Sequence, residues 1–294
     1  MALPPTDPNG SGVGVVTVSY GSQGVLPDFL ESIPAASSHS SFVVVIDNLP
    51  SPDSPVARLA AGANAHYAPM DSNLGYGAAM NAGVALLPPT VRWVLLSNPD
   101  VVLTAGAIDE LVRVAEQDER IAAVGPALLT ADGEIYPSAR AVPSLRTGVG
   151  HALFVNLWVE NPWTRAYRND QATLAVERDA GWLSGACLLV RRDVFEKLGG
   201  FDPGYFMYFE DVDLGYRMGK AGYRSVYAPS AVAVHSGAHS TTSESGRMIA
   251  AHHQSARRFL NRKYSGAWLW PIRVTLTIGL QLRSALLRRR LDAS

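Results

Sequence analysis

Apolar residues in this chain occur in short uninterrupted runs, separated by segments in which small or apolar residues recur at helical spacing. The runs are rich in β-branched residues and do not alternate with polar ones, which is typical of strands buried on both faces of a sheet. The sequence predicts such strands at residues 13–20, 42–46, 66–68, 91–96, 121–129, 182–190 and 224–235. The segments between them predict helices at residues 26–33, 56–61, 75–87, 107–117, 193–198 and 211–221.

Strands that alternate with helices indicate an α/β protein with one Rossmann-like, mostly parallel sheet flanked by helices. Residues 131–180 interrupt the alternation, because they mix Pro, Gly, Arg and aromatic residues without a clear period. We expect irregular, substrate-facing structure there. A chain of 294 residues with 47% apolar residues is long enough to bury one large core.

Two terminal segments differ from this body, which we place at residues 13–240. Residues 1–12 are rich in Pro, Gly and small polar residues and lack the basic and apolar regions of a signal peptide, so we expect a disordered leader. Residues 241–294 are expected to form a basic, helical C-terminal appendage. Nine of the 25 Lys and Arg residues, but only one of the 26 acids, lie within residues 257–294.

This charge pattern suits a tail that binds an anionic membrane surface. Trp268, Trp270 and the basic residues 288–290 favour the membrane interface, whereas the charged residues that interrupt the apolar stretch argue against a membrane span. The alternative is that the tail packs on the body or on a second copy of the chain. We expect a peripheral protein at the cytoplasmic face of the plasma membrane, with no nucleic-acid partner.

Two classes of chemistry are disfavoured by what the sequence lacks. The single cysteine, Cys187, excludes an internal disulfide and a cysteine-rich metal site, and its apolar neighbours predict a buried thiol. Residues 19–24, which follow the first strand, read SYGSQG and lack the G-x-G-x-x-G spacing of a dinucleotide-binding unit. The chain is therefore not expected to be a dehydrogenase.

Acidic residues cluster where a site is expected. Glu210, Asp211 and Asp213 directly follow the apolar residues 206–209. Like charges this close cost free energy unless a cation, a metal or a polar ligand offsets them. Acids also suit an ordinary helix N-terminus, which is the alternative interpretation. The apolar residues that precede the cluster favour a site.

Two further acids follow predicted strands, at the sheet edge where ligands of α/β proteins gather. Asp100 ends the segment LLSNPD, where its carboxylate could hold a hard cation such as Mg²⁺ or Mn²⁺. Asp47 ends the second strand, where it could accept hydrogen bonds from a nucleoside. Ordinary turns that end a strand are the alternative for both residues.

Taken together, these segments resemble the family 2 glycosyltransferases of GT-A fold, over about residues 13–240. Within that family the chain looks most like the bacterial, and in particular the actinobacterial, rhamnosyltransferases. The likeness implies an inverting, metal-dependent transfer of L-rhamnose from dTDP-L-rhamnose to polyprenyl-diphosphate-linked N-acetylglucosamine, a step in building the linker between peptidoglycan and arabinogalactan. The motifs that carry it are VVTVSY, FVVVIDN, NLGYGAAMNAG, LLSNPDV, GWLSGACLLVRRDVFEKLGGFDPGYFMYFEDVDL and VAVHSGAH.

The resemblance also implies a role for each matching residue. It implies Asp211 as the catalytic base with Glu210 as its partner, and Asp100 with His235 as ligands of Mg²⁺ or Mn²⁺. Asn98 stands where the family's metal motif has its first acid, so Asp100 is expected to supply most of the metal binding. Acceptor contacts are implied for Trp182, Ser184 and Gly185, and donor contacts for Ser19, Tyr20, Asp47, Asn73, Gly75 and Asn98, with Asn81 on the same helix.

The sequence leaves three alternatives open. A glycosyltransferase could use a UDP-hexose or UDP-galactofuranose to build another surface polysaccharide. A glycoside hydrolase would use two carboxylates without nucleotide or metal. A non-catalytic scaffold would bind a sugar nucleotide or a lipid without turnover. A lone histidine after an apolar strand, such as His235, also often serves only as a structural hydrogen-bonding group.

Overall fold

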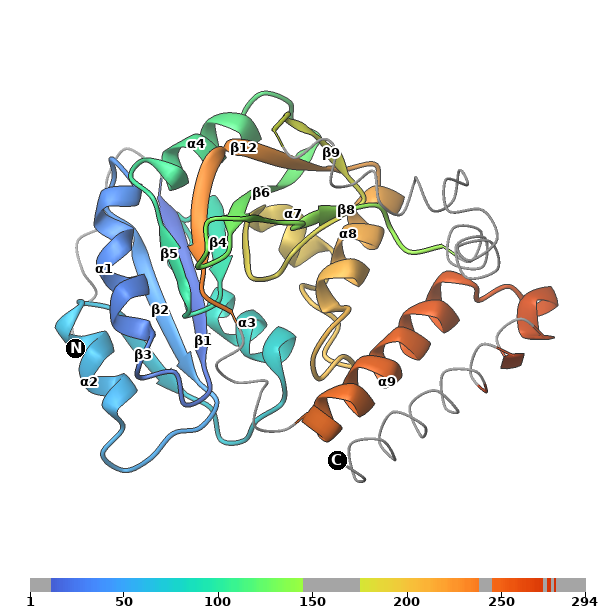
Figure 1. The fold of residues 1–294 in the computed structure, drawn as a ribbon, viewed down its shortest axis with the longest axis horizontal. Coiled ribbons are helices and arrows are strands. Elements are labelled where there is room, and N and C mark those ends of the chain that lie inside the picture. Colours follow the sequence, from blue (N-terminus) through green and yellow to red (C-terminus); the bar gives the residue numbers. More distant parts are fainter. Residues whose placement is uncertain (1–11, 145–174, 238–244, 272–273, 276–277, 279–294) are drawn as a thin grey trace.

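A computed structural model describes residues 12–144, 175–237, 245–271, 274–275 and 278 (Figure 1). The predicted leader at residues 1–12 therefore lies almost wholly outside the described residues, as does most of the tail beyond residue 271. One large sheet organises the described part of the chain. Its strands lie in the order β3 (His66–Pro69), β2 (Phe42–Asp47), β1 (Val13–Ser19), β4 (Trp93–Ser97), β11 (Cys187–Arg191), β6 (Ile121–Leu129), β12 (Arg224–His235) and β5 (Val101–Leu103).

The sheet combines a parallel half with a mixed half. Strands β3, β2, β1 and β4 are mutually parallel, as the buried runs predicted. Strand β11 is antiparallel to both of its neighbours, β4 and β6, whereas β6 and β12 are parallel. Three short strands lie beside this path: β7 (Ile135–Tyr136) pairs with β6, β9 (Arg178–Ala180) pairs with β12, and β8 (Ala139–Arg140) pairs with β10 (Trp182–Leu183) in a separate small sheet.

Helices cover both faces of the sheet, so the predicted fold class is confirmed (Figure 1). One face carries α1 (Leu26–Ala36), α2 (Pro55–Gly62) and α4 (Ala107–Ala115). The other face carries α3 (Tyr76–Ala85), α7 (Arg192–Lys197) and α8 (Glu210–Lys220). Because both faces are covered, central strands such as β4 are buried along their whole length.

The first part of the expected tail packs on the body. Helix α9 (Ser245–Lys263) buries Phe259 completely in a small apolar cluster with Tyr205 and Val212, which belong to α8 and the loop before it. A short 3₁₀ helix (Ala267–Leu269) follows. None of the helices in the described part of the chain combines the length and hydrophobicity that a bilayer span requires.

The structure corrects three details of the predicted elements. The apolar run at residues 182–190 is not one strand but two, β10 and β11, separated by a turn at residues 184–186. The stretch at residues 131–180 contains the short strands β7, β8 and β9 rather than only irregular structure. Strand β5 directly follows the Asp100 turn and was not expected, because three apolar residues after a turn give no periodic signal.

Candidate active site

The metal candidates come together from two distant strands. Asp100 lies in the turn between β4 and β5, and His235 is the last residue of β12, which pairs with β5. Asp100 Oδ1 lies 3.2 Å from His235 Nε2, and Asn98 Nδ2 lies 3.4 Å from the same nitrogen. Both ion-pair side chains are mostly buried, with 11% of Asp100 and 18% of His235 exposed. A carboxylate, an imidazole and an amide therefore converge on one point.

The acid cluster begins helix α8, and the backbone before it is strained. Tyr208 and Phe209 both have a φ of 67°, in the left-handed region that side-chain-bearing residues rarely adopt. Such conformations cost of order 1–3 kcal/mol each and concentrate at functional sites. They turn the chain sharply at the start of α8, so that the side chains of Glu210 and Asp211 point into the molecule rather than into solvent.

Two amide groups fix the carboxylate of Asp211. Oδ2 accepts a hydrogen bond of 3.0 Å from the Gly185 N–H, and Oδ1 accepts one of 2.8 Å from the Val212 N–H. Burial raises the pKa of Asp211, and these two donors oppose part of that rise because they stabilise the charged form. The side chain is thus an oriented carboxylate in an enclosed place.

Glu210 is buried beside Asp211, but its carboxyl group lacks the hydrogen bonds that hold Asp211. It is 7% exposed, and its Oε2 is buried without a hydrogen-bond partner in the described part of the chain. Burial, and then the charge of Asp211, raise the pKa of Glu210 well above its ordinary value. Two adjacent buried carboxyl groups resist ionising together. Glu210 is therefore the one that keeps a proton more readily, and Asp211 is the one that hydrogen bonds hold in its charged form.

The acceptor candidates lie in and next to the turn between β10 and β11. Trp182 donates from Nε1 to the Ala141 carbonyl over 3.1 Å, and Ser184 accepts through Oγ from the Ala186 N–H over 3.3 Å. Helix α8 passes close to this strand, since a Cβ added at Gly215 would lie 2.7 Å from Trp182 Cβ. Trp182, Ser184 and Gly185 therefore lie beside the helix that carries Asp211.

Several residues expected to contact the sugar-nucleotide donor already make hydrogen bonds within the protein. The Asp47 carboxylate is only 1% exposed and accepts hydrogen bonds from the Leu49 N–H, the Ser54 hydroxyl and the Tyr67 hydroxyl, each over 3.0 Å. Ser19 is also buried and accepts from the Ser22 N–H through Oγ. Both residues lie at the carboxyl edge of the sheet, as predicted, and a direct contact with a nucleoside stays a prediction.

The segment before helix α3 holds the remaining donor candidates. Asn73 accepts from the Gly75 N–H over 2.9 Å, which closes the turn into the helix. Gly75 has a φ of 93°, and an added Cβ would lie 2.0 Å from the Phe206 carbonyl oxygen, so only glycine fits here. Asn81 exchanges two hydrogen bonds with the Phe201 backbone and anchors that loop. Tyr20, in contrast, is 40% exposed at the same sheet edge.

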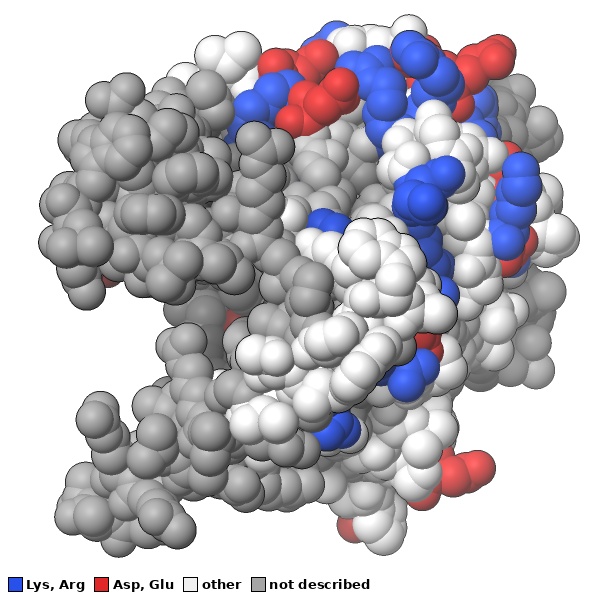
Figure 2. Space-filling view, turned by 90° about the vertical axis from the view of Figure 1, so that its right-hand side faces the viewer, with Lys and Arg blue, Asp and Glu red and all other residues white. Residues whose placement is uncertain are grey.

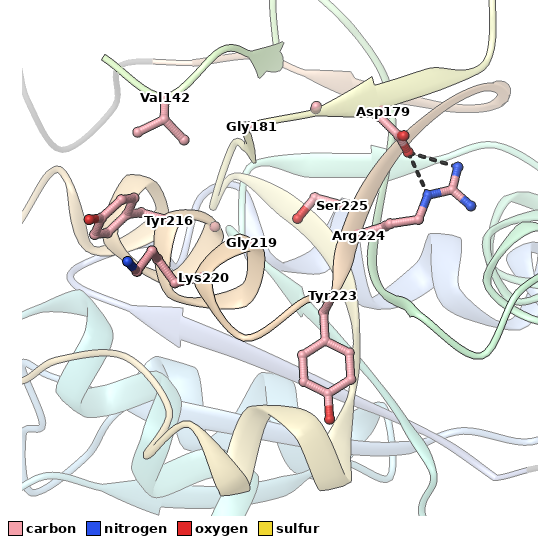
Figure 3. A pocket seen from close by; sticks show the side chains of 11 residues that line it. Val142, Asp179, Gly181, Tyr216, Gly219, Lys220, Tyr223, Arg224 and Ser225 are labelled. Carbon is pink, nitrogen blue, oxygen red and sulfur yellow. Dashed lines mark hydrogen bonds and ion pairs between the residues drawn. The ribbon is translucent and has the colours of Figure 1, made fainter. Parts of the chain in front are cut away.

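A separate cavity of about 320 Å³ lies beside the far part of α8 (Figure 3). It is lined by residues of α8, β9 and the start of β12, including Tyr216, Lys220 and the ion pair between Asp179 and Arg224. None of the predicted site residues lines it. The described acids of the candidate site therefore do not open into this cavity.

Sequence reasoning missed two residues of the acid site. Tyr76 donates from its hydroxyl to the Gly185 carbonyl over 2.6 Å, and Arg140 faces Asp211 closely enough to oppose the rise in the pKa of that carboxyl. Tyr76 lies inside the motif NLGYG, next to residues that were singled out, so its position was a usable signal. Arg140 lies in a stretch without periodicity, and no pattern pointed to it.

Comparisons with known proteins identify the family to which the chain belongs. The profile described as "Glycosyltransferase like family 2" matches residues 8–260. The N-acetylglucosaminyl-diphospho-decaprenol L-rhamnosyltransferase of Mycobacterium tuberculosis is 44% identical over 284 residues, which are 94% of this chain and 92% of that protein. The rhamnosyltransferase WbbL of Escherichia coli is 27% identical over 85% of this chain and 93% of its own length.

Solved structures share the fold at low sequence identity. A mannosyltransferase from Pyrobaculum calidifontis, in complex with GDP-Man and Mn²⁺, matches with a TM-score of 0.57 and 16% identity over 96% of this chain and 73% of its own. GalNAc-T7 with UDP, GalNAc and Mn²⁺ matches with a TM-score of 0.56 and 14% identity over 78% of this chain and 44% of its own. This chain therefore belongs to glycosyltransferase family 2 and is a glycosyltransferase of GT-A fold.

Proposed function

We propose that the chain transfers L-rhamnose from dTDP-L-rhamnose to a polyprenyl-diphosphate-linked N-acetylglucosamine, with inversion at the sugar carbon. The name of the mycobacterial relative, which is 44% identical over 94% of this chain, supports that donor sugar and that acceptor. The observation that carries the mechanism is the carboxylate of Asp211, held by two amide N–H groups at the start of α8. A UDP-sugar donor is the alternative within the same reaction class.

Asp211 would act as the base. Its carboxylate would take the proton of the acceptor hydroxyl while the oxygen attacks the sugar carbon from the side opposite the leaving diphosphate. One displacement of this kind inverts the configuration. Glu210, with its raised pKa, would stay protonated beside it and so limit the negative charge that the acceptor oxygen meets. The buried surroundings of both acids would keep bulk water from competing with the acceptor.

Asp100 and His235 are the residues that would hold a divalent cation, with Asn98 nearby. The carboxylate oxygen suits Mg²⁺ or Mn²⁺, and the imidazole nitrogen 3.2 Å from it, as a softer ligand, suits Mn²⁺ better than Mg²⁺. The described residues contain no group of three or more His, Cys, Asp or Glu that could hold a metal ion, so among them the site rests on Asp100 and His235. The cation would supply charge relief on the leaving diphosphate.

The arrangement favours transfer over hydrolysis. Hydrolases place their two carboxyl groups on opposite sides of the scissile bond. Here Glu210 and Asp211 are consecutive residues of one helix turn. The third acid, Asp100, pairs with His235, as a ligand of a diphosphate-bound metal would. An oriented, partly buried carboxylate that accepts two backbone hydrogen bonds suits a base, which favours an enzyme over a non-catalytic scaffold.

We also propose that the tail meets the membrane that carries the lipid-linked acceptor. Trp268 and Trp270 are 80% and 60% exposed, which suits an interfacial role. The charge argument is weaker than the sequence indicated, because Arg258 and Arg262 pair with Asp202 and Lys263 donates to the Pro143 carbonyl. Among the described residues on the face drawn in Figure 2, basic side chains lie among acidic and uncharged ones.

Transfer assays test the reaction. The purified protein is given a polyprenyl-diphosphate-linked N-acetylglucosamine with dTDP-L-rhamnose, UDP-glucose or UDP-galactofuranose, with and without Mg²⁺ or Mn²⁺. We expect turnover with dTDP-L-rhamnose and a metal. Asp211→Asn should lower kcat by about 10²–10⁴-fold with little change in donor binding, because only the base is lost. Asp132→Asn, in an exposed turn, is the matched control. Turnover with a UDP-sugar alone would reject the proposed donor.

Calorimetry and liposome binding test the metal and the tail. Asp100→Ala should abolish the metal-dependent part of donor binding, and unchanged affinity would reject Asp100 as a ligand. Removing residues 267–294 should shift the protein from anionic liposomes into the supernatant, and added salt should do the same because it screens exposed charges. Unchanged sedimentation would instead favour packing on the body or on a second copy.

A further inference from the structure

The turn at residues 184–186 contacts three segments of the acid site. Its Ala186 carbonyl accepts from the Asn98 N–H over 2.8 Å, which ties it to the Asp100 turn. Its Gly185 N–H donates to Asp211 on α8, and its Gly185 carbonyl accepts from Tyr76 at the start of α3. The metal candidates, the candidate base and the donor-side segment therefore share one short piece of backbone.

From this geometry, and resting on the role of Asp211 given above, we propose that Tyr76 is a positioning residue for the base. Its hydroxyl holds the Gly185 carbonyl, and the Gly185 N–H in turn orients the Asp211 carboxylate toward the acceptor hydroxyl. Tyr76 does not contact the reacting atoms in this proposal. It acts through the backbone of Gly185.

Gly185 needs such an anchor because it is a glycine. Its N–H and its carbonyl belong to two different peptide planes, which rotate freely about a Cα without a side chain. The Tyr76 bond fixes the carbonyl plane over 2.6 Å, and the Ala186 carbonyl is fixed by Asn98. The Gly185 N–H, in the preceding peptide plane, donates to Asp211 Oδ2 over 3.0 Å, so a shift of the turn at the Gly185 carbonyl would also move this donor.

Tyr76 is well suited to hold a carbonyl. Burial, and then the charges of Glu210 and Asp211, raise its pKa well above the ordinary value, so its hydroxyl keeps the proton that it donates. The Tyr76 N–H donates to the Phe206 carbonyl over 3.1 Å, and its ring contacts the Phe201 ring with centroids 6.2 Å apart. The loop that leads to α8 therefore fixes the tyrosine that in turn fixes the base on α8.

The groups that face Asp211 set the direction of the expected pH effect. Glu210 lies beside it on α8, Arg140 faces it from β8, and Tyr76 faces it from α3. The Gly185 N–H lowers the pKa of Asp211 because it stabilises the carboxylate. If that donor loses its alignment, the pKa of Asp211 should rise, and the acid limb of the rate profile should move to higher pH.

Tyr76→Phe is the decisive variant, because it keeps the ring and removes only the hydroxyl. We expect kcat to fall about tenfold, equivalent to about 1.4 kcal/mol of activation free energy. Donor KM should stay unchanged, and the acid limb of kcat/KM should move to higher pH. Tyr223→Phe is the matched control, since its hydroxyl contacts only the exposed Lys197 among the interactions described, and it should match the wild type. A Tyr76→Phe enzyme with wild-type kcat and pH profile would overturn the proposal.

A double-mutant cycle separates positioning from general damage. If Tyr76 acts through Asp211, Tyr76→Phe should cost almost nothing further in an Asp211→Asn background. Equal losses in both backgrounds would overturn the proposal and indicate a purely structural role.

Carbon-13 NMR titration of the Asp211 carboxyl carbon in the protein without substrates, assigned with Asp211→Asn, gives a readout that needs no turnover. An upward pKa shift in Tyr76→Phe supports the proposal, and an unchanged pKa overturns it. A wild-type protein without transferase activity would reject the proposed function alone and would leave this titration interpretable.

Discussion

Replacing Arg217 by Met should destabilise the fold by about 3–5 kcal/mol, because it leaves a buried carboxylate short of a cation. Asp213 is completely buried on α8, and its Oδ2 lies 2.6 Å from Arg217 Nε. Arg217 also donates to the carbonyls of Leu198 and Gly200, over 2.9 and 2.7 Å. After the substitution, Arg262 would be the one cation left to Asp213 among the described residues, 3.2 Å away, and it already pairs with Asp202.

That loss is a large part of the 5–15 kcal/mol by which folded domains are usually stable. Urea unfolding at neutral pH, followed by circular dichroism, measures it as a shift in the midpoint. Arg113→Met is the matched control, since it removes an exposed pair with Glu110 and should shift the midpoint very little. Adding Asp213→Asn to Arg217→Met should restore part of the stability, because the unpaired charge is gone.

The reasoning fails if Arg217→Met costs less than about 1 kcal/mol, the range of exposed pairs. It also fails if the Asp213→Asn addition makes the protein still less stable, since the cost would then come from packing rather than charge. The first result would mean that water or another cation reaches Asp213 in solution, and the second that Arg217 acts mainly through packing.

Three further outcomes follow from the same region. Because the pKa of Glu210 is raised above its ordinary value of 4.5, the folded protein keeps a proton at pH values where the unfolded chain has released it. The free energy of unfolding should therefore fall as the pH rises. Glu210→Gln should flatten that fall, measured by urea unfolding between about pH 5 and pH 8. Gly75→Ala should lower both the melting temperature and kcat, because its Cβ would collide with the Phe206 carbonyl, and an unchanged melting curve would contradict the clash. Phe259→Ala should cost about 3–5 kcal/mol and make α9 a preferred site of limited proteolysis, whereas a protease-resistant α9 would show that the ion pairs alone hold it.

The strands of the parallel half could be predicted because their composition strongly favours buried strands. The runs at Val13–Ser19 and Phe42–Asp47 are buried on both faces and contain almost no polar residues. The turn at residues 184–186 was missed: Ser184 and Gly185 form a turn-favouring pair, but they lie inside an apolar run that reads as one strand. That turn depends on contacts with residues far away in the sequence.

The sequence predicted which residues would form the candidate site better than it predicted their contacts. Asp100 was singled out at a strand end and His235 through the family resemblance, and the structure brings these two residues, 135 positions apart in sequence, together because β12 pairs with β5. Asp47 was also at a strand end, but local sequence could not show that Ser54 and Tyr67 would occupy its carboxylate. The charge count of the tail likewise could not show that Asp202, in the body, pairs with Arg258 and Arg262 of the tail.

The place of β11 in the sheet has a consequence for how the molecule folds. Strands β4 and β6 do not pair with each other; both pair with β11, which follows β6 by more than 50 residues of sequence. During synthesis the first half of the sheet therefore emerges with an open edge at β4, and such edges invite aggregation until they are covered. The strand that closes the gap begins directly after the turn that holds Asp211. The strand that joins the two halves of the sheet is therefore also the one that brings the aligning Gly185 N–H to the Asp211 carboxylate.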